Sequence, residues 1–334
     1  ERPLCRYDLA WEETYAMEIP QFFSLRKVIQ AFAVRAVFRL ASGDSAGAAR
    51  DIITMHRLAE AGGRDPLLVG MLIGLAGHAS ALNVLWDGLD RRAFTDPELQ
   101  ELDVVLAGID PFPQRLAAVL RMERAIALRA LDELEANPRR TRAMTGTPDH
   151  DPVFRWGFST WMSANRLGVS EDLQEAILAP GGTPVTRLEW KSFVDWERRI
   201  EHRWRGPRKT LEALATLLTP APVAAGRRAY LMEAEIGHAR LAIALERHRL
   251  ATGAYPASLA ALVPDFLPAL PEDRINGRPV EYRLKPDGTP LLYQWGFDGD
   301  DDGGSPRKDP GHGDLVWQYS LPPGFTEADW RRKD

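Results

Sequence analysis

The sequence predicts a mainly α-helical protein, in which an irregular antiparallel helical bundle precedes a small α+β module with a short antiparallel sheet. Three observations indicate this fold class. Apolar residues recur at helical spacing over long stretches before residue 220. Beyond Gly253, prolines, glycines and short runs with Tyr and Trp replace those patterns. Two hairpin signals, Asn276-Gly277 and Asp287-Gly288, stand between these short runs.

Length and composition set broad limits. With 334 residues the chain is longer than a usual single domain, so we expect two unequal domains, residues 1–220 and 227–334. A net charge of −5 and a pI near 5.9 argue against a nucleic-acid partner, because phosphate contacts need clustered Lys and Arg. The single cysteine, Cys5, excludes an intrachain disulfide, and no Cys/His spacing matches a zinc site.

The first helices are predicted from apolar spacing and turn residues. A helix from about Gln21 ends at the break Ser42-Gly43-Asp44, and a second runs over 46–61. Asp65-Pro66 and Asp96-Pro97 each place a capping acid before a proline, which predicts two further helix starts. The apolar positions of the first helix are Leu25, Val28, Ile29, Phe32 and Ala36.

The segment 67–86 is about long enough to span a bilayer of ~30 Å, and Gly70 and Gly74 have the spacing that lets helices approach closely. The competing interpretation is a buried core helix of a soluble domain. We favour it because polar residues interrupt the run and acids bracket it: His78, Ser80, Asn83, Asp65 and Asp87.

Further helices are predicted at 113–136 and over 190–218, the latter as one kinked helix or two. Successive antiparallel helices joined by short turns resemble helical-hairpin arrays of the tetratricopeptide type. However, residues 20–220 have no fixed repeat period, so we predict an irregular bundle. Pro220, Pro222 and Gly226 indicate a break before the second unit.

Four motifs follow one another in the C-terminal region, after a predicted helix at 229–250. They are Gly253–Pro256, Leu270–Asp273, Tyr293–Gly299 and Asp314–Trp317. This order resembles the globular part of the major pseudopilins of bacterial type II secretion systems, and the resemblance covers 227–320. It implies a helix followed by an antiparallel sheet, and a Ca²⁺ ion in the loop between the last two strands, near Asp298 and either Asp309 or Asp314.

The same loop carries a metal-binding pattern of its own. Its residues at positions 1, 3, 5, 6 and 12 of a calcium-loop pattern are Asp298, Asp300, Asp302, Gly303 and Asp309, with Asp in place of the usual final Glu. Carboxylates about 4 Å apart repel by roughly 4 kcal/mol per pair at an effective dielectric near 20, which favours a neutralising cation. We therefore predict a Ca²⁺ site formed by Asp298, Asp300, Asp302, Asp309 and Asp314. The alternative is an acidic, solvated loop.

Signals for catalysis are weak. Glu235 and His238 form a Glu-x-x-His pair, which is half of a di-iron motif, and no second pair is present. His56 lies on the apolar face of its predicted helix and is interpreted as a packed residue. The sequence contains no nucleophile elbow, phosphate-binding glycine loop or HExxH motif, so we predict that the protein is not an enzyme.

The first functional hypothesis is a non-enzymatic scaffold or binding protein of the bacterial periplasm, cell envelope or extracellular space. It binds a protein partner through the helical domain and is stabilised by Ca²⁺ in its C-terminal module. True pseudopilins begin with a leader and an apolar assembly helix, which residues near Glu1 do not resemble, so we do not expect assembly into a fibre. Because the given sequence begins at Glu1 without Met, it leaves room for a signal peptide or membrane anchor upstream. The alternatives are a cytoplasmic helical adaptor with an unliganded acidic loop, and a metal-dependent enzyme.

Overall fold

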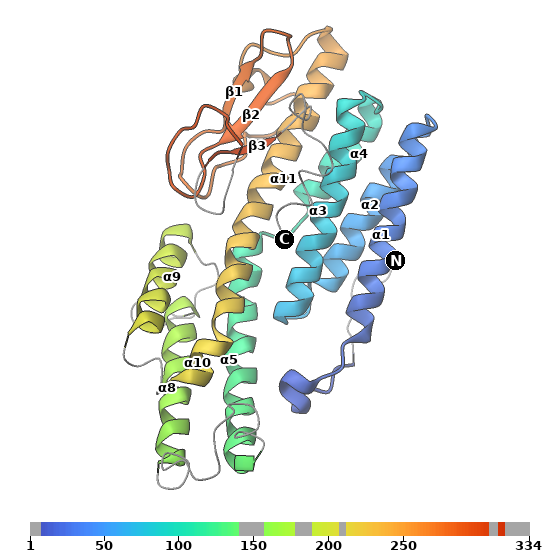
Figure 1. Cartoon of the computed structure of the whole chain (residues 1–334). Helices are drawn as coiled ribbons and strands as arrows, with labels where there is room; N and C mark the ends of the chain where they lie inside the picture. Colours follow the sequence, from blue (N-terminus) through green and yellow to red (C-terminus); the bar gives the residue numbers. More distant parts are fainter. Residues whose placement is uncertain (1–7, 140–156, 178–188, 207–211, 307–312, 318–334) are drawn as a thin grey trace. The chain divides into compact units, whose positions relative to one another are not determined.

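The structure is a computed structural model, and the residues that it describes are 8–139, 157–177, 189–206, 212–306 and 313–317 (Figure 1). Most of these residues lie in α-helices, and three strands form one antiparallel sheet late in the chain. The predicted fold class, mainly α with a small antiparallel sheet, is therefore confirmed.

The elements follow the predicted order from helices to sheet. The first part of the chain contains a 3₁₀ turn, η1 (Trp11–Ala16), then α1 (Pro20–Ala41), α2 (Ser45–Gly62), α3 (Leu68–Asp90), α4 (Asp96–Ala107) and α5 (Phe112–Ala136). The later helices are α8 (Phe158–Ile177), α9 (Trp190–Arg205), α10 (Ala213–Leu218) and α11 (Pro220–Thr252). A second 3₁₀ turn, η3 (Leu259–Leu262), precedes β1 (Glu281–Leu284), β2 (Pro290–Gln294) and β3 (Leu315–Trp317). The sequence patterns above do not assign α8, and the segment 190–218 holds two helices.

The chain divides into two compact units, each assembled from three separate stretches. Unit 1 comprises the described residues within 1–28, 58–77 and 110–232, and unit 2 those within 29–57, 78–109 and 233–334. The divisions fall within α1, α2, α3 and α11. The units therefore do not follow the linear order of the predicted domains, 1–220 and 227–334.

The predicted break at 220–226 is wrong, because α11 runs without interruption from Pro220 to Thr252. Pro220 and Pro222 lie in its first turn, where backbone N–H groups have no partner within the helix, so the missing donors cost little. Gly226 gives no flexibility here either. A side chain at Gly226 would collide with the ring of Phe193 from α9, so the glycine allows close packing within unit 1.

Unit 1 is held together by α8, which packs against α5, α9 and α10. An aromatic cluster joins α9 to the start of α11: the rings of Trp190 and Tyr230 lie 4.8 Å apart, and Phe193 lies 5.6 Å from Tyr230. Beside it, the Arg227 guanidinium binds both carboxylate oxygens of Glu197 at 2.7 Å.

The start of α3 differs from the prediction. Asp65 was expected to cap it, but α3 begins at Leu68, whose N–H donates to Glu123 Oε1 of α5 at 3.2 Å. A capping acid from another helix satisfies the same unpaired donor that a local cap would satisfy. Burial raises the pKa of Glu123, and this hydrogen bond opposes the rise.

α3 is long and apolar enough to cross a membrane, with a mean hydropathy of 1.7, and 61% of that stretch is buried inside the protein. Its N-terminal half packs closely in unit 1. A side chain at Gly70 would lie 3.1 Å from the carbonyl of Gly62, and one at Gly74 would lie 3.0 Å from the carbonyl of Ala59. The two glycines therefore allow α3 to approach the end of α2 closely.

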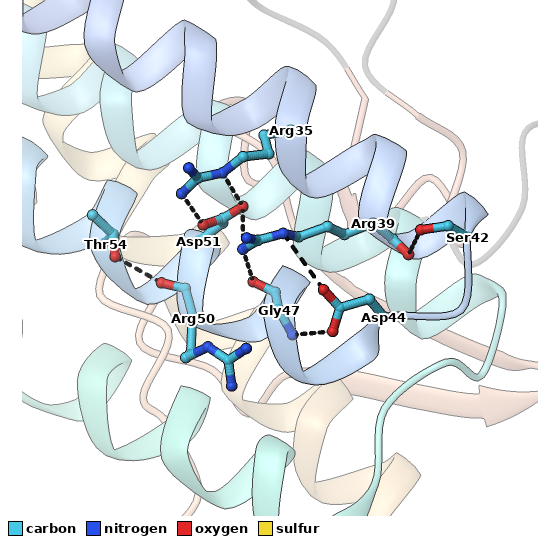
Figure 2. Close-up of polar contacts among 8 residues, drawn as sticks. All are labelled: Arg35, Arg39, Ser42, Asp44, Gly47, Arg50, Asp51 and Thr54. Atoms are coloured by element: carbon cyan, nitrogen blue, oxygen red, sulfur yellow. Dashed lines mark hydrogen bonds and ion pairs between the residues drawn. The ribbon is translucent and has the colours of Figure 1, made fainter.

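In unit 2, a buried carboxylate joins α1 to α2 (Figure 2). Asp51 accepts hydrogen bonds from Arg35 Nε and Nη2, at 2.9 and 2.6 Å, and its Oδ2 lies 2.9 Å from Arg39 Nη1. Arg39 Nη1 also donates to the carbonyl of Gly47, and Asp44 accepts from the Gly47 N–H. The predicted turn at Ser42-Gly43-Asp44 is confirmed, and Gly43 adopts a φ of +82° within it.

The sheet has the order β1-β2-β3, and both pairs are antiparallel. The Asp287-Gly288 hairpin between β1 and β2 is confirmed: Lys285 N–H donates to the Thr289 carbonyl, and Asp287 Oδ1 accepts from the Thr289 N–H. The hairpin predicted at Asn276-Gly277 is wrong. These residues form a turn before β1, in which the Gly277 N–H donates to the carbonyl of Asp273.

Candidate metal centre

The acidic loop joins β2 to β3 and begins and ends at two close backbone segments. A side chain at Gly296 would collide with the carbonyl of Gly313, so glycine is required for this approach. Asp298 Oδ2 accepts a hydrogen bond from the Gly313 N–H at 3.2 Å. Asp298 therefore joins the two ends of the loop. Asp314 is the residue that directly follows Gly313.

Asp314 is the buried carboxylate of the loop, with 1% of its surface exposed. Its Oδ2 accepts from the Gly304 N–H at 2.7 Å, and its own N–H donates to the Ser305 carbonyl at 2.9 Å. Its Oδ1 is buried without a hydrogen-bond partner. Burial raises the pKa of Asp314, and the charges of Asp301 and Asp302 raise it further, while backbone hydrogen bonds lower it.

Asp301 is a loop residue that the sequence patterns missed. Its Oδ1 accepts from the Gly303 N–H at 2.8 Å and from the Tyr293 hydroxyl of β2 at 3.2 Å. The calcium-loop pattern skipped it because it occupies an even position between Asp300 and Asp302. A signal was nevertheless present, since Asp301 stands in a run of three acids.

The other predicted ligands do not share the buried environment of Asp314. Asp300 and Asp302 are exposed, and the N–H of Asp300 donates to Asp298 Oδ1 at 3.3 Å. Asp309 lies outside the described residues. Within the described part of the chain, no group of three or more His, Cys, Asp or Glu side chains is arranged to hold a metal ion. The loop thus contains the described acids Asp298, Asp300, Asp301, Asp302 and Asp314, but the structure does not arrange them into a complete set of ligands.

The available donors are of the type that a hard cation requires. They are carboxylate oxygens and the backbone carbonyls of the loop, and Ca²⁺ binds six to eight such oxygens. The unpartnered Oδ1 of Asp314 is a buried acceptor, and a buried carboxylate oxygen costs free energy unless a donor or cation satisfies it. The donor atoms of this loop are therefore of the type that Ca²⁺ binds, and Asp314 is the most buried of its described carboxylates.

A buried turn at residues 273–277 holds the start of the acidic loop in place. Asp273 Oδ1 accepts hydrogen bonds from the N–H groups of Ile275 and Asn276, at 2.8 and 3.2 Å, and from Gln294 Nε2 at 3.0 Å. Asn276 Nδ2 then donates to the carbonyls of Trp295 and Gly296. The Leu270–Asp273 motif of the sequence thus positions the residues that precede Asp298. Burial raises the pKa of Asp273 despite these bonds.

The histidines noted in the sequence lie in other environments. His238 of α11 is fully buried, whereas Glu235 is exposed, so the Glu-x-x-His pair does not form a shared site. His56 is buried as predicted. It forms a contact that the sequence patterns missed, because its Nδ1 lies 2.9 Å from Nδ1 of His78 on α3. The two residues come from different helices, and no local spacing connects them.

Comparison with protein-family models, curated proteins and solved structures found no match to this chain. The local chemistry of the loop and the arrangement of the elements are therefore the basis for a functional proposal.

Proposed function

We propose that this chain is a non-enzymatic scaffold or binding protein of the bacterial envelope or extracellular space, and that Ca²⁺ stabilises its pseudopilin-like C-terminal module. One observation carries the metal part of the proposal. Asp314 is buried, and the backbone N–H groups of Gly304 and Asp302 approach its carboxylate, yet its Oδ1 lacks a hydrogen bond of good geometry and the charges of neighbouring acids act on it. A divalent cation would satisfy that oxygen and offset the repulsion.

The location follows from the chemistry of the ion. Extracellular calcium modules bind Ca²⁺ in the range of about 10⁻⁴–10⁻³ M, which external calcium fills and cytosolic calcium does not. The resemblance of 227–320 to pseudopilins points to the same compartments. The helical elements are then free to bind a protein partner, in keeping with the acidic net charge of −5, which disfavours nucleic acid.

A second candidate function rests on a different observation. Asp298, Asp301 and Asp314 each accept hydrogen bonds from backbone N–H groups within the loop. Carboxylates used in this way stabilise a turn without any ion. The second candidate is therefore a cytoplasmic helical adaptor whose acidic loop is folded by its own hydrogen bonds.

Denaturation with and without calcium separates the two candidates. At a free Ca²⁺ concentration about a hundredfold above Kd, the free energy of unfolding should rise by about 2.7 kcal/mol relative to chelator. Urea or thermal unfolding followed by circular dichroism measures this difference. An equal midpoint in Ca²⁺ and in chelator would favour the adaptor and end the calcium proposal.

Asp314→Asn tests whether Asp314 is the ligand, because it removes the charge and keeps the shape. In chelator, this variant should be as stable as the wild type or more stable, since the wild type buries an unsatisfied carboxylate. In Ca²⁺ the order should reverse, with the wild type more stable. The matched control is Asp265→Asn, an exposed acid outside the loop, which should show the wild-type response to calcium.

A further inference from the structure

A cleft in unit 1 lies apart from the acidic loop and has its own chemistry. Its volume is about 230 Å³, and it is formed by η1, α5 and α10. The lining residues are Thr14, Tyr15, Ala16, Ala130, Leu131, Glu133, Leu134, Leu214, Leu217 and Leu218. Three separate elements thus line one small, partly open space.

The walls of the cleft are mainly aliphatic. Leu131 and Leu214 are buried, whereas Leu217 is 68% exposed although it is a large apolar side chain. An aliphatic lining of this kind favours an apolar occupant. At about 30 Å³ per water-sized group, the volume has room for roughly eight such groups, which corresponds to a phenylethyl body.

One lining residue, Glu133, carries a formal charge. Its Oε2 accepts a hydrogen bond from the Thr14 hydroxyl at 3.4 Å, and its Oε1 lies 3.5 Å from Nε of Arg129. The side chain of Arg129 is 61% exposed, so this ion pair contributes little and a competing cation can replace it. Glu133 is therefore a carboxylate at an apolar cleft whose counter-ion is exchangeable.

The backbone of η1 supports a binding role. Thr14 has a φ of 50°, a conformation that β-branched residues rarely adopt, and its side chain is buried beside Glu133. Such strain persists where the surrounding structure imposes it, and it is common at ligand sites. Tyr15, the next residue, also lines the cleft, and aromatic rings attract cations.

We propose that this cleft binds a small free organic amine, with its apolar body among the leucines of α5 and α10 and its ammonium group against Glu133. Charge complementarity selects the cation, and the volume selects a body of phenylethyl size. The site is independent of the proposed calcium function, because no residue is shared between them.

Ligand-detected NMR on the full chain, with three probes of one shape, tests the proposal. The probes are 2-phenylethylammonium, the neutral 2-phenylethanol and the anionic phenylacetate. We expect the ammonium probe to bind at least about tenfold more tightly than the alcohol, and phenylacetate not to bind. Equal binding of ammonium and alcohol would overturn the assignment of an amine. A fourth probe, Nα-acetyl-lysine amide, keeps a lysine ε-ammonium. If it bound as tightly as 2-phenylethylammonium, the assignment of a small free amine would be wrong, because a lysine of a partner protein would fit equally well.

Three variants make the test specific. Glu133→Gln should reduce affinity for the ammonium probe to that for the alcohol, whereas Arg129→Gln should increase it several-fold by removing the competing cation. Ala130→Leu should abolish binding of every probe by filling the cleft. The matched control is Asp132→Asn, an exposed acid of the same helix that does not line the cleft. If Glu133→Gln and Arg129→Gln leave the affinity for ammonium unchanged, the proposal is wrong.

Discussion

At the scale of single residues, the buried histidines illustrate how position decides chemistry. Nδ1 of His56 and Nδ1 of His78 lie 2.9 Å apart, so one must donate and the other accept. His56 Nε2 is buried without a partner. If His56 carries its proton on Nδ1, that Nε2 is a bare lone pair rather than an unsatisfied donor, which costs less. We therefore assign the donor role to His56. Burial and the neighbouring His78 lower the pKa of His56 well below its usual value.

His238 leads to a prediction about acid stability. Burial lowers its pKa from 6.5 to about 4. The neutral His238 ring is buried in the folded protein, whereas in the unfolded chain the ring binds a proton more readily. The free energy of unfolding is therefore unaffected by His238 above pH 6.5 and decreases as the pH falls toward the folded pKa. The loss amounts to about 3 kcal/mol. Urea unfolding from neutral pH to about pH 4 measures it, and His238→Leu should flatten the profile. Parallel profiles for variant and wild type would contradict the prediction.

At the scale of elements, the ends of helices explain several correct and incorrect predictions. α11 ends at a glycine with a φ of +85°, Gly253, whose N–H donates to the carbonyl of Arg249. Such an end is readable from sequence, because glycine adopts this conformation without strain. The start of α3 was not readable, since its cap, Glu123, lies 55 residues away. Local rules thus predict the termini that local residues satisfy.

The end of α3 leads to a second prediction. Arg92, just after the end of α3, has a φ of 52°. The residues with positive φ just after α1 and α11 are the glycines Gly43 and Gly253. Arg92→Gly should raise the free energy of unfolding by about 0.5–1 kcal/mol, because glycine removes the strain of this backbone conformation. Arg91→Gly is the matched control and should destabilise, since it also removes the ion pair with Asp87. Thermal unfolding of both variants checks the signs, and a destabilised Arg92→Gly would refute the prediction.

The hairpin of α1 and α2 leads to a third prediction. Asp51 is 2% exposed and two arginines of α1 converge on it (Figure 2). Asp51→Asn should therefore destabilise the protein by about 2–3 kcal/mol, because it leaves those cations without their carboxylate. Arg50→Gln serves as the control, since Figure 2 shows its side chain pointing away from the cluster. Equal unfolding midpoints for these two variants would show that the cluster contributes nothing.

At the scale of the whole molecule, the fold class was predictable and the grouping of the elements was not. Helical spacing and the change in composition beyond Gly253 predicted helices followed by a sheet. The compact units nevertheless divide α1, α2, α3 and α11 between them. A long helix contributes to two cores without any break in its sequence, so linear signals such as Pro220 and Gly226 do not mark the division. The loop acids were predictable by type, but the contact of Asp301 with the Tyr293 hydroxyl and that of Asp273 with Gln294 of β2 depend on how the strand and the turns fold together.

The last prediction concerns the response of the whole chain to calcium and pH together. Burial and nearby charges raise the pKa of Asp314, so without an ion the folded protein favours the protonated carboxyl in acid. Ca²⁺ needs the deprotonated form, and therefore competes with the proton. The calcium-induced increase in unfolding free energy should be small near about pH 4 and should reach its full value by about pH 7. In Asp314→Asn the response should be weak at both values. A calcium effect of equal size at both pH values in the wild type would place the ion away from Asp314.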